Sequence, residues 1–159
     1  MEKPKISRIL APLDFSEISP RVLDYALLLA GQNRAELVLM HAVHVPPLAE
    51  TSTWIEPLLS PSVEQELRLQ LKSTAEKQLQ ELQERCAREG VAATICILEG
   101  VPNSEILRCA EEQKADLIVM GSQGHSTVSR FLIGSTAERV VRRSHLTVLC
   151  VKPEEEKKD

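Results

Sequence analysis

The residues best suited to chemistry lie in one glycine-containing polar segment toward the carboxyl end of the chain. It reads Gly-Ser-Gln-Gly from Gly121 to Gly124 and, after nine further residues, Gly-Ser-Thr from Gly134 to Thr136. Glycines let a ligand approach the backbone closely and leave amide N–H groups free to point at it. Such groups suit a phosphate, so the segment is either a phosphate-binding loop or a plain polar turn, and the residues alone leave both open.

Side chains of this segment could add to a phosphate site. Hydroxyl donors and one cation are available at Ser122, Ser126, Ser135, Thr136 and Arg130. His125 is expected to be an exposed loop histidine, with a phosphate contact as the alternative. Ser135 and Glu138 have the spacing of a capping box, which predicts a helix that starts here with its positive end toward the ligand. The segment is not a Walker A loop or a G-x-G-x-x-G dinucleotide fingerprint, because neither motif is present.

The elements that must position this segment alternate between strand and helix. Apolar runs predict strands at 6–13, 36–43, 92–98, 115–120 and 146–151. Helical spacing predicts helices between Ser16 and Asn33 and at 62–89, 103–113 and 135–143, with Ser16 or Ser19-Pro20 at the first start and Gly31 or Asn33 at its end. This order predicts a Rossmann-like α/β fold, an open five-stranded parallel sheet with helices on both faces and strand order 3-2-1-4-5.

In such a sheet, ligands bind where the winding direction reverses, beyond the carboxyl ends of the strands. That crevice lies between the ends of the first and fourth strands, which end in Pro12-Leu13-Asp14 and in Gly121-Ser-Gln-Gly124. Asp14 could contact a ribose there or simply cap the turn into the first helix. The glycine segment therefore falls where the topology predicts a ligand.

Two further stretches surround this core. Residues 46–61 contain four prolines and predict a surface loop, in which Trp54 could cover a ligand or pack on the long helix. That helix, 62–89, is expected to lie on the sheet rather than in a coiled coil, because it has too few heptads. Its apolar positions are Val63, Leu67, Leu71, Ala75, Leu79, Leu82 and Cys86.

Composition excludes several classes of function. The 159 residues suit one domain, 1–152, followed by a charged tail at 153–159. Aromatic residues make up 3% and the net charge is −4, which disfavours nucleic acid as a partner. The chain has no apolar run of bilayer length and no signal-peptide pattern, and its four cysteines have no disulfide or zinc spacing. We expect a cytoplasmic protein without a membrane contact, with reduced cysteines.

Several stretches of the chain resemble the universal stress protein family. They are RILAPLDFSEISPRVLDYALLLA, LVLMHAV, ADLIVMGSQGHS, FLIGSTAERVVRRS and TVLCV, and the resemblance covers about residues 5–152. In that family, the pattern G-x-x-G, nine residues, then G-[ST] marks the members that bind ATP. Gly121, Gly124, Gly134 and Ser135 match this pattern in full.

The resemblance implies a role for each matching position. Asp14 would hydrogen-bond the ribose with Pro12 and Leu13 beside the nucleoside. Ala42 would contact the adenine, and Met120 and Gly121 would flank base and sugar. The phosphates would be held by Gly124, Gly134, Ser135 and Thr136. ATP, ADP or AMP is the expected ligand, with Mg²⁺ or Mn²⁺ bound mainly through phosphate oxygens and water, and no side chain is expected to ligate the metal.

The resemblance also implies a homodimer that pairs through the last strand, Leu146 to Val151. The chain departs from the family just before that strand, where His145-Leu146-Thr147 replaces a small residue and proline. The expected function is a nucleotide-dependent stress-response module read by an unidentified protein partner. We expect little or no hydrolysis and no catalytic residue, because no acid lies between Gly124 and Gly134 to orient a water. A slow ATPase or autophosphotransferase, and a dimeric scaffold that ignores nucleotide, remain the alternatives.

Overall fold

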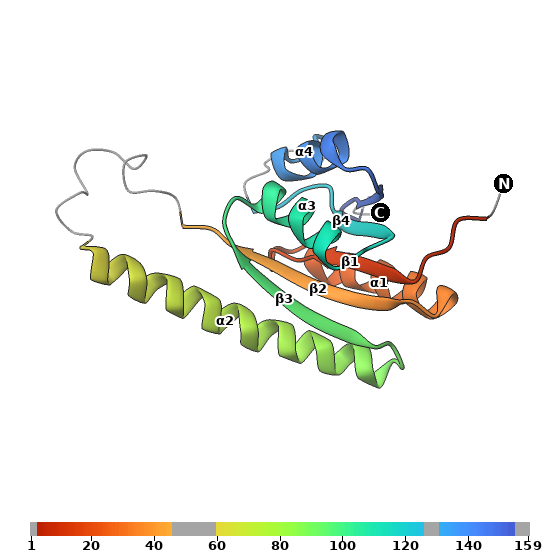
Figure 1. Cartoon of the computed structure of the whole chain (residues 1–159), viewed down its shortest axis with the longest axis horizontal. Helices are drawn as coiled ribbons and strands as arrows, with labels where there is room; N and C mark the ends of the chain where they lie inside the picture. The colour runs from red at the N-terminus through yellow and green to blue at the C-terminus, as the bar shows by residue number, and fades with distance from the viewer. Residues whose placement is uncertain (1–2, 46–59, 126–130, 155–159) are drawn as a thin grey trace, which may run out of the picture.

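A computed structural model of the chain describes residues 3–45, 60–125 and 131–154 (Figure 1). The charged residues 155–159 and most of the proline-rich loop with Trp54 lie outside this description. The strands are β1 (Arg8–Pro12), β2 (Glu36–Val43), β3 (Ala93–Glu99), β4 (Leu117–Gly121) and β5 (Thr147–Val151). The helices are α1 (Ser19–Asn33), α2 (Pro61–Arg88), α3 (Pro102–Glu112) and α4 (Ser135–Arg143).

The five strands form one parallel sheet in the order β3-β2-β1-β4-β5, which confirms the predicted topology. The strand β1 lies at the centre, with Ile9 beside Leu37 of β2 on one side and beside Leu117 of β4 on the other. The chain winds outward from β1 to β3 and then returns to the other side of β1. The reversal therefore falls between β1 and β4, as the sequence predicts.

Helices cover both faces of the sheet (Figure 1). Alternate residues of β1 point to opposite faces: Ile9 packs in the core beneath α1 and α2, and Leu10 in the core beneath α3 and α4. The central strands are buried on both sides, which explains their continuous apolar sequence. The sheet is thus a rigid support for the loops at its carboxyl edge.

The predicted element boundaries agree with the structure within two residues. Of the alternative signals for α1, the start at Ser19-Pro20 and the end at Asn33 are confirmed, and Ser16 and Gly31 are wrong. Ser16 does not cap α1, because the residue before the helix is Ile18 and the Ser16 hydroxyl donates to Asp14 instead. Gly31 does not end α1, since the helix continues to Asn33 and stops where Arg34 adopts a left-handed conformation at φ 54°.

The long helix α2 lies on the sheet over only part of its length. Its buried residues, Ala75, Leu79 and Cys86, all belong to the carboxyl half. Three apolar positions of the helix that was expected to lie on the sheet, Val63, Leu67 and Leu71, are instead exposed to 40% or more, because the amino half of α2 extends past the sheet (Figure 1). Among the described residues, no helix combines the length and apolarity needed to span a membrane.

Candidate functional site

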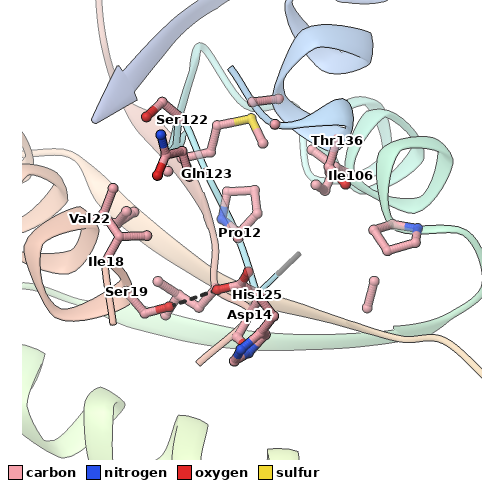
Figure 2. A pocket seen from close by; sticks show the side chains of 18 of the residues that line it. Pro12, Asp14, Ile18, Ser19, Val22, Ile106, Ser122, Gln123, His125 and Thr136 are labelled. Carbon is pink, nitrogen blue, oxygen red and sulfur yellow. Dashed lines mark hydrogen bonds between the residues drawn. The ribbon is translucent and has the colours of Figure 1, made fainter. Parts of the chain in front are cut away.

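A cavity of about 260 Å³ opens at the carboxyl ends of β1 and β4 (Figure 2). Its volume is close to the lower end of the range for small-molecule sites, about 300 to 1,000 Å³. The walls come from the ends of β1, β2 and β4, from the segment after β4 and from the first turns of α1, α3 and α4. The cavity thus lies at the predicted reversal point of the sheet.

The structure brings most of the predicted site residues to this one cavity. The predicted nucleotide-binding residues that line it are Pro12, Leu13, Asp14, Ala42, Met120, Gly121, Gly124, Gly134, Ser135 and Thr136. Ser122 and His125 line it as well, whereas Ser126 and Arg130 fall outside the described residues. The chain therefore gathers segments more than 100 residues apart around one space.

The two carboxylate oxygens of Asp14 have different surroundings. Oδ1 accepts hydrogen bonds from the backbone N–H of Ser16 at 3.0 Å and from the hydroxyl of Ser19 at 3.1 Å. Figure 2 shows the second of these bonds. These bonds fix the carboxylate at the start of α1. Oδ2 accepts no hydrogen bond from the described residues and lies against Gly124. This oxygen is available to a ligand hydroxyl.

Two histidines hold the backbone turn that carries Asp14. His41 Nδ1 lies 2.7 Å from the carbonyl oxygen of Leu13, and His125 Nε2 lies 2.7 Å from the carbonyl oxygen of Asp14. A nitrogen facing a carbonyl must carry the proton, so each ring donates there. Phe15 adopts φ 59° beside them and stacks on His41, with ring centroids 4.7 Å apart. A phenylalanine in this conformation is strained, so the turn is held by its surroundings.

The first two glycines of the motif sit where a side chain would not fit. A Cβ on Gly121 would lie 2.9 Å from the Ile18 side chain and 3.0 Å from the Gln123 carbonyl oxygen. A Cβ on Gly124 would lie 2.5 Å from Asp14 Oδ2. Glycine at 124 therefore lets the loop backbone approach the carboxylate closely.

The third glycine joins the loop to the last helix. The N–H of Gly134 donates to the Ser122 carbonyl oxygen at 2.6 Å, and the Ser122 N–H donates to Val151 of β5 at 2.8 Å. Ser122 is 3% exposed, so this link lies in the interior. It anchors the amino end of α4 beside the end of β4.

The predicted capping box at this helix start is wrong. Gly134 is the residue before the helix, and no side chain caps it. Ser135 already occupies the first helical turn, so it is one position too late to pair with Glu138 as a capping box requires. The first N–H groups of α4 consequently have no partner within the helix. They and the hydroxyls of Ser135 and Thr136 remain available to an anion.

The charged groups of the cavity are few. Among its described lining residues, Asp14 is the single carboxylate, His41 and His125 are the titratable bases, and there is no lysine or arginine. The described parts of the chain also contain no group of three or more side chains suited to hold a metal ion. The described lining thus offers donors for phosphate oxygens but no ready-made cluster of metal ligands.

Sequence reasoning missed the residues that the first turns of α1 and α3 contribute. Ser19 and Val22 of α1 line the cavity, as does Ile18 just before that helix, and Pro102 and Ile106 line it from α3. Their helical spacing predicts burial against the sheet, and the same spacing gives no sign that the first turn overhangs a cavity. Met40, His41, Gln123 and Ala137 complete the lining.

Comparisons of sequence and of structure with known proteins lead to the same family. Residues 5–152 match the model of the universal stress protein family. The universal stress protein MJ0531 of Methanocaldococcus jannaschii is 36% identical over 148 residues, which cover 91% of this chain and 81% of that protein.

Solved structures are similar over nearly the whole chain. The structure of MJ0577, a universal stress protein from the same organism, matches with a TM-score of 0.79 and 27% identity, covering 95% of this chain and 99% of that one. A universal stress protein in complex with cAMP matches with a TM-score of 0.64 and 26% identity, covering 93% and 98%.

Proposed function

The chain belongs to the universal stress protein family, and from this premise we propose that its cavity binds an adenine nucleotide, with ATP as the expected ligand. The observation that carries the proposal is the pairing of two unlike groups across one space. Asp14 presents at one side a carboxylate oxygen that accepts no hydrogen bond from the described residues, and the amino end of α4 presents uncapped N–H groups at another. The carboxylate oxygen suits the hydroxyls of a ribose, and the free N–H groups suit a phosphate, so a ligand that carries both can use the two groups together.

Each part of the nucleotide has a suitable surface. Apolar side chains of Pro12, Ile106 and Met120, with the small Ala42, suit a flat base. Asp14 Oδ2 accepts from the ribose hydroxyls. The backbone at Gly124 and Gly134 and the hydroxyls of Ser135 and Thr136 hold the phosphates. The similar protein solved with cAMP supports an adenine nucleotide as the ligand class.

A divalent cation in this site, Mg²⁺ or Mn²⁺, would neutralise phosphate charge. It would be bound through phosphate oxygens and water, because the described lining offers no cluster of metal ligands. In this proposal, the protein holds the nucleotide, and the nucleotide in turn holds the cation.

We propose a regulatory role with little or no turnover. Efficient hydrolysis needs a group that orients water at the terminal phosphate. Asp14, the single carboxylate of the described lining, is committed to the ribose in this assignment. Nucleotide occupancy would instead be read by a protein partner in the cytoplasm. A slow ATPase or autophosphotransferase, and a scaffold that ignores nucleotide, are the competing functions.

The experiment is a thermal melt of nucleotide-free protein with and without excess MgATP. At about 100 times the dissociation constant, a ligand stabilises the folded state by about 2.7 kcal/mol, which raises Tm by roughly 5 to 10 °C in a domain of this size. Gly124→Asp should abolish the shift, because its carboxylate would meet Asp14 and the phosphates. Gly90→Asp is the matched control, since Gly90 follows α2 at the opposite edge of the sheet and has open space around an added Cβ. The strain of a side chain at its φ of 77° lowers Tm with and without MgATP alike, so the ligand-induced shift should remain.

The outcomes separate the three functions. A shift in wild type and Gly90→Asp, lost in Gly124→Asp, supports nucleotide binding. Absence of a shift in folded wild-type protein at millimolar MgATP contradicts it and leaves the scaffold. Release of labelled γ-phosphate well above the Gly124→Asp background would establish turnover and replace the regulatory role with an enzymatic one.

We also propose that two copies associate through β5. This strand is an edge of the sheet, and its central residues Val148, Leu149 and Cys150 are only half-buried. An apolar edge of this kind favours pairing with a second strand. Leu149→Lys should dissociate the dimer by placing like charges near the two-fold axis, whereas Leu149→Met should not. Light scattering after gel filtration decides, and a monomeric wild type contradicts the proposal.

A further inference from the structure

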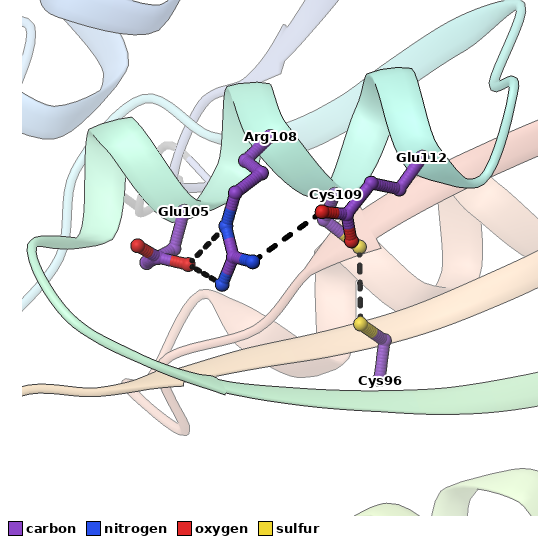
Figure 3. Close-up of polar contacts among 5 residues, drawn as sticks. All are labelled: Cys96, Glu105, Arg108, Cys109 and Glu112. Carbon is purple, nitrogen blue, oxygen red and sulfur yellow. Dashed lines mark hydrogen bonds and ion pairs between the residues drawn. The ribbon is translucent and has the colours of Figure 1, made fainter.

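Two cysteines that do not line the cavity face each other between the sheet and α3 (Figure 3). Cys96 belongs to β3 and Cys109 to α3, thirteen positions later in the chain. The thiol of Cys109 donates a hydrogen bond to the sulfur of Cys96, and the two Sγ atoms are 3.2 Å apart. A disulfide has a sulfur separation of about 2.05 Å, so a closure of about 1.2 Å would join them.

The two thiols differ in accessibility. Cys109 is fully buried on the inner face of α3, whereas Cys96 is half-buried on β3, the strand at one edge of the sheet. A small oxidant arriving from solvent therefore meets Cys96 first. Cys109 is then the neighbouring thiol within reach. This is the arrangement of an attacking thiol and a resolving thiol.

The hydrogen bond between the thiols also shifts their two pKa values in opposite directions. It lowers the pKa of Cys96 to about 7, against the opposing effect of burial. The same contact, with burial, raises the pKa of Cys109. Three charged groups of α3 face the pair: Arg108 favours the thiolate of Cys96, and Glu105 and Glu112 oppose it. Arg108 lies 2.5 Å from Glu105 and 3.3 Å from Glu112, so its charge is largely neutralised.

We propose that Cys96 and Cys109 are a reversible redox pair that a peroxide closes into an intramolecular disulfide. The thiolate of Cys96 attacks one peroxide oxygen, the O–O bond breaks, and with one proton the products are an alcohol or water and Cys96 sulfenic acid. The thiol of Cys109 then attacks that sulfur, and the hydroxyl leaves with the thiol's proton as water. Two thiols and one hydrogen peroxide thus give one disulfide and two waters. A dithiol reductant reverses the reaction.

This pair is independent of the nucleotide proposal. Neither Cys96 nor Cys109 lines the cavity, and the disulfide forms or fails to form whatever the cavity binds. The bridge would join the edge strand β3 to α3. It would make the chain responsive to peroxide as well as to any ligand.

The test treats reduced full-length protein with hydrogen peroxide and then alkylates it under denaturing conditions. The expected product has lost 2 Da, takes up two alkyl groups instead of four, and yields a cross-linked peptide that contains Cys96 and Cys109. Dithiothreitol should restore all four alkylation sites. Cys150→Ala is the matched control, because Cys150 is also half-buried but its pKa is raised by burial and it should not be needed.

Variants identify the order of attack. Cys109→Ala should accumulate sulfenic acid at Cys96, trapped by dimedone, and Cys96→Ala should leave Cys109 unreacted. The rate of alkylation at Cys96 should rise about tenfold from pH 6 to pH 8, since a thiol with a pKa near 7 is already partly ionised at pH 6. A thiol with an unperturbed pKa near 9 would show a rise of about 100-fold.

Two results would overturn the proposal. One is a wild-type protein that keeps all four thiols after peroxide has oxidised a free-thiol standard. The other is a disulfide that maps to Cys86, to Cys150 or between two chains. Because the wild-type peptide map alone decides these cases, the conclusion does not depend on the folding of any variant.

Discussion

Asp14 has one carboxylate oxygen bound within the protein and one facing the cavity, and this division predicts the effect of a single-atom change. In Asp14→Asn, the remaining oxygen can still accept from Ser16 and Ser19, so the turn should be kept. The oxygen that faces Gly124 becomes an uncharged amide donor. A hydrogen bond to a charged group contributes about 1.5 to 3 kcal/mol and a neutral one about 1 kcal/mol, so affinity for ATP should fall about 2- to 30-fold.

Calorimetric titration of ATP measures this loss, and 2′-deoxy-ATP supplies the control. If the carboxylate binds the ribose hydroxyls, wild-type protein should lose affinity for the deoxy ligand and Asp14→Asn should lose less. An asparagine variant that binds both ligands as wild type does would remove Asp14 from the site. Its Tm without ligand should remain close to that of wild type.

At the scale of one element, α1 contains a glycine that the fold does not require. Gly31 lies inside the helix with an ordinary φ, and a Cβ there meets nothing within 4 Å. Gly31→Ala should raise the free energy of unfolding by about 0.4 to 1 kcal/mol, because alanine restricts the unfolded chain and favours helix. Urea denaturation measures the change, and a fall in stability would contradict it.

Gly90, which follows α2, is the matched contrast. It also has open space around a Cβ, but its φ is 77°, a conformation that alanine adopts at a cost. Gly90→Ala should therefore destabilise the protein by about 1 kcal/mol, opposite in sign to Gly31→Ala. Equal effects of the two substitutions would show that local backbone conformation does not decide either one.

The elements themselves could be predicted because each has one dominant periodicity. The strand Glu36–Val43 and the helix Ser135–Arg143 were predicted to the residue, and the alternation of strands with helices fixed the parallel order. Helix starts were harder. Ser16 and Ser135 are of a type that caps helices, yet Ser16 instead donates to Asp14 and Ser135 lies inside the first turn. The Ser16 hydroxyl is taken by a carboxylate two residues earlier, and Gly134 before α4 is held by the Ser122 carbonyl oxygen; the spacing of residue types reports neither bond.

The candidate site was predictable where residue type and topology agreed. Asp14 and Gly124 stand at adjacent strand ends, so the predicted strand order alone brings them together. Ile18 and Ile106 were not identified, because an apolar residue at or near a helix start is predicted to be core whether or not a cavity lies beneath it. The histidine bonds to Leu13 and Asp14 depend on side-chain orientation and had no sequence signal.

At the scale of the whole molecule, buried thiols make stability depend on alkaline pH. Burial raises the pKa of both Cys86 and Cys150 above the ordinary value of 9.0. Above about pH 9 these thiols ionise in the unfolded chain while the folded protein keeps them protonated. Their contribution to stability is therefore complete below pH 9 and is lost as pH rises through the folded-state pKa values, by up to about 1.4 kcal/mol per pH unit for each thiol.

Urea denaturation in reducing buffer at pH 8, 9 and 10 measures this slope. Cys86→Ala should lower the free energy of unfolding at pH 8, because buried side-chain atoms are lost. Above pH 9, the free energy of unfolding of this variant should decline less steeply with pH than that of wild type, because the contribution of one thiol is gone. A decline as steep as that of wild type would mean that Cys86 ionises in the folded state as readily as in the unfolded chain.

The uneven burial of α2 has a consequence for how the molecule opens. Only the half of the helix that contains Ala75, Leu79 and Cys86 is packed on the sheet, so the first turns after Pro61 can unwind without disturbing the core. The rate of amide hydrogen exchange should therefore be high near the start of α2 and fall progressively toward Cys86, where exchange requires global unfolding. A single helix would then span the range from local fraying to the full stability of the domain.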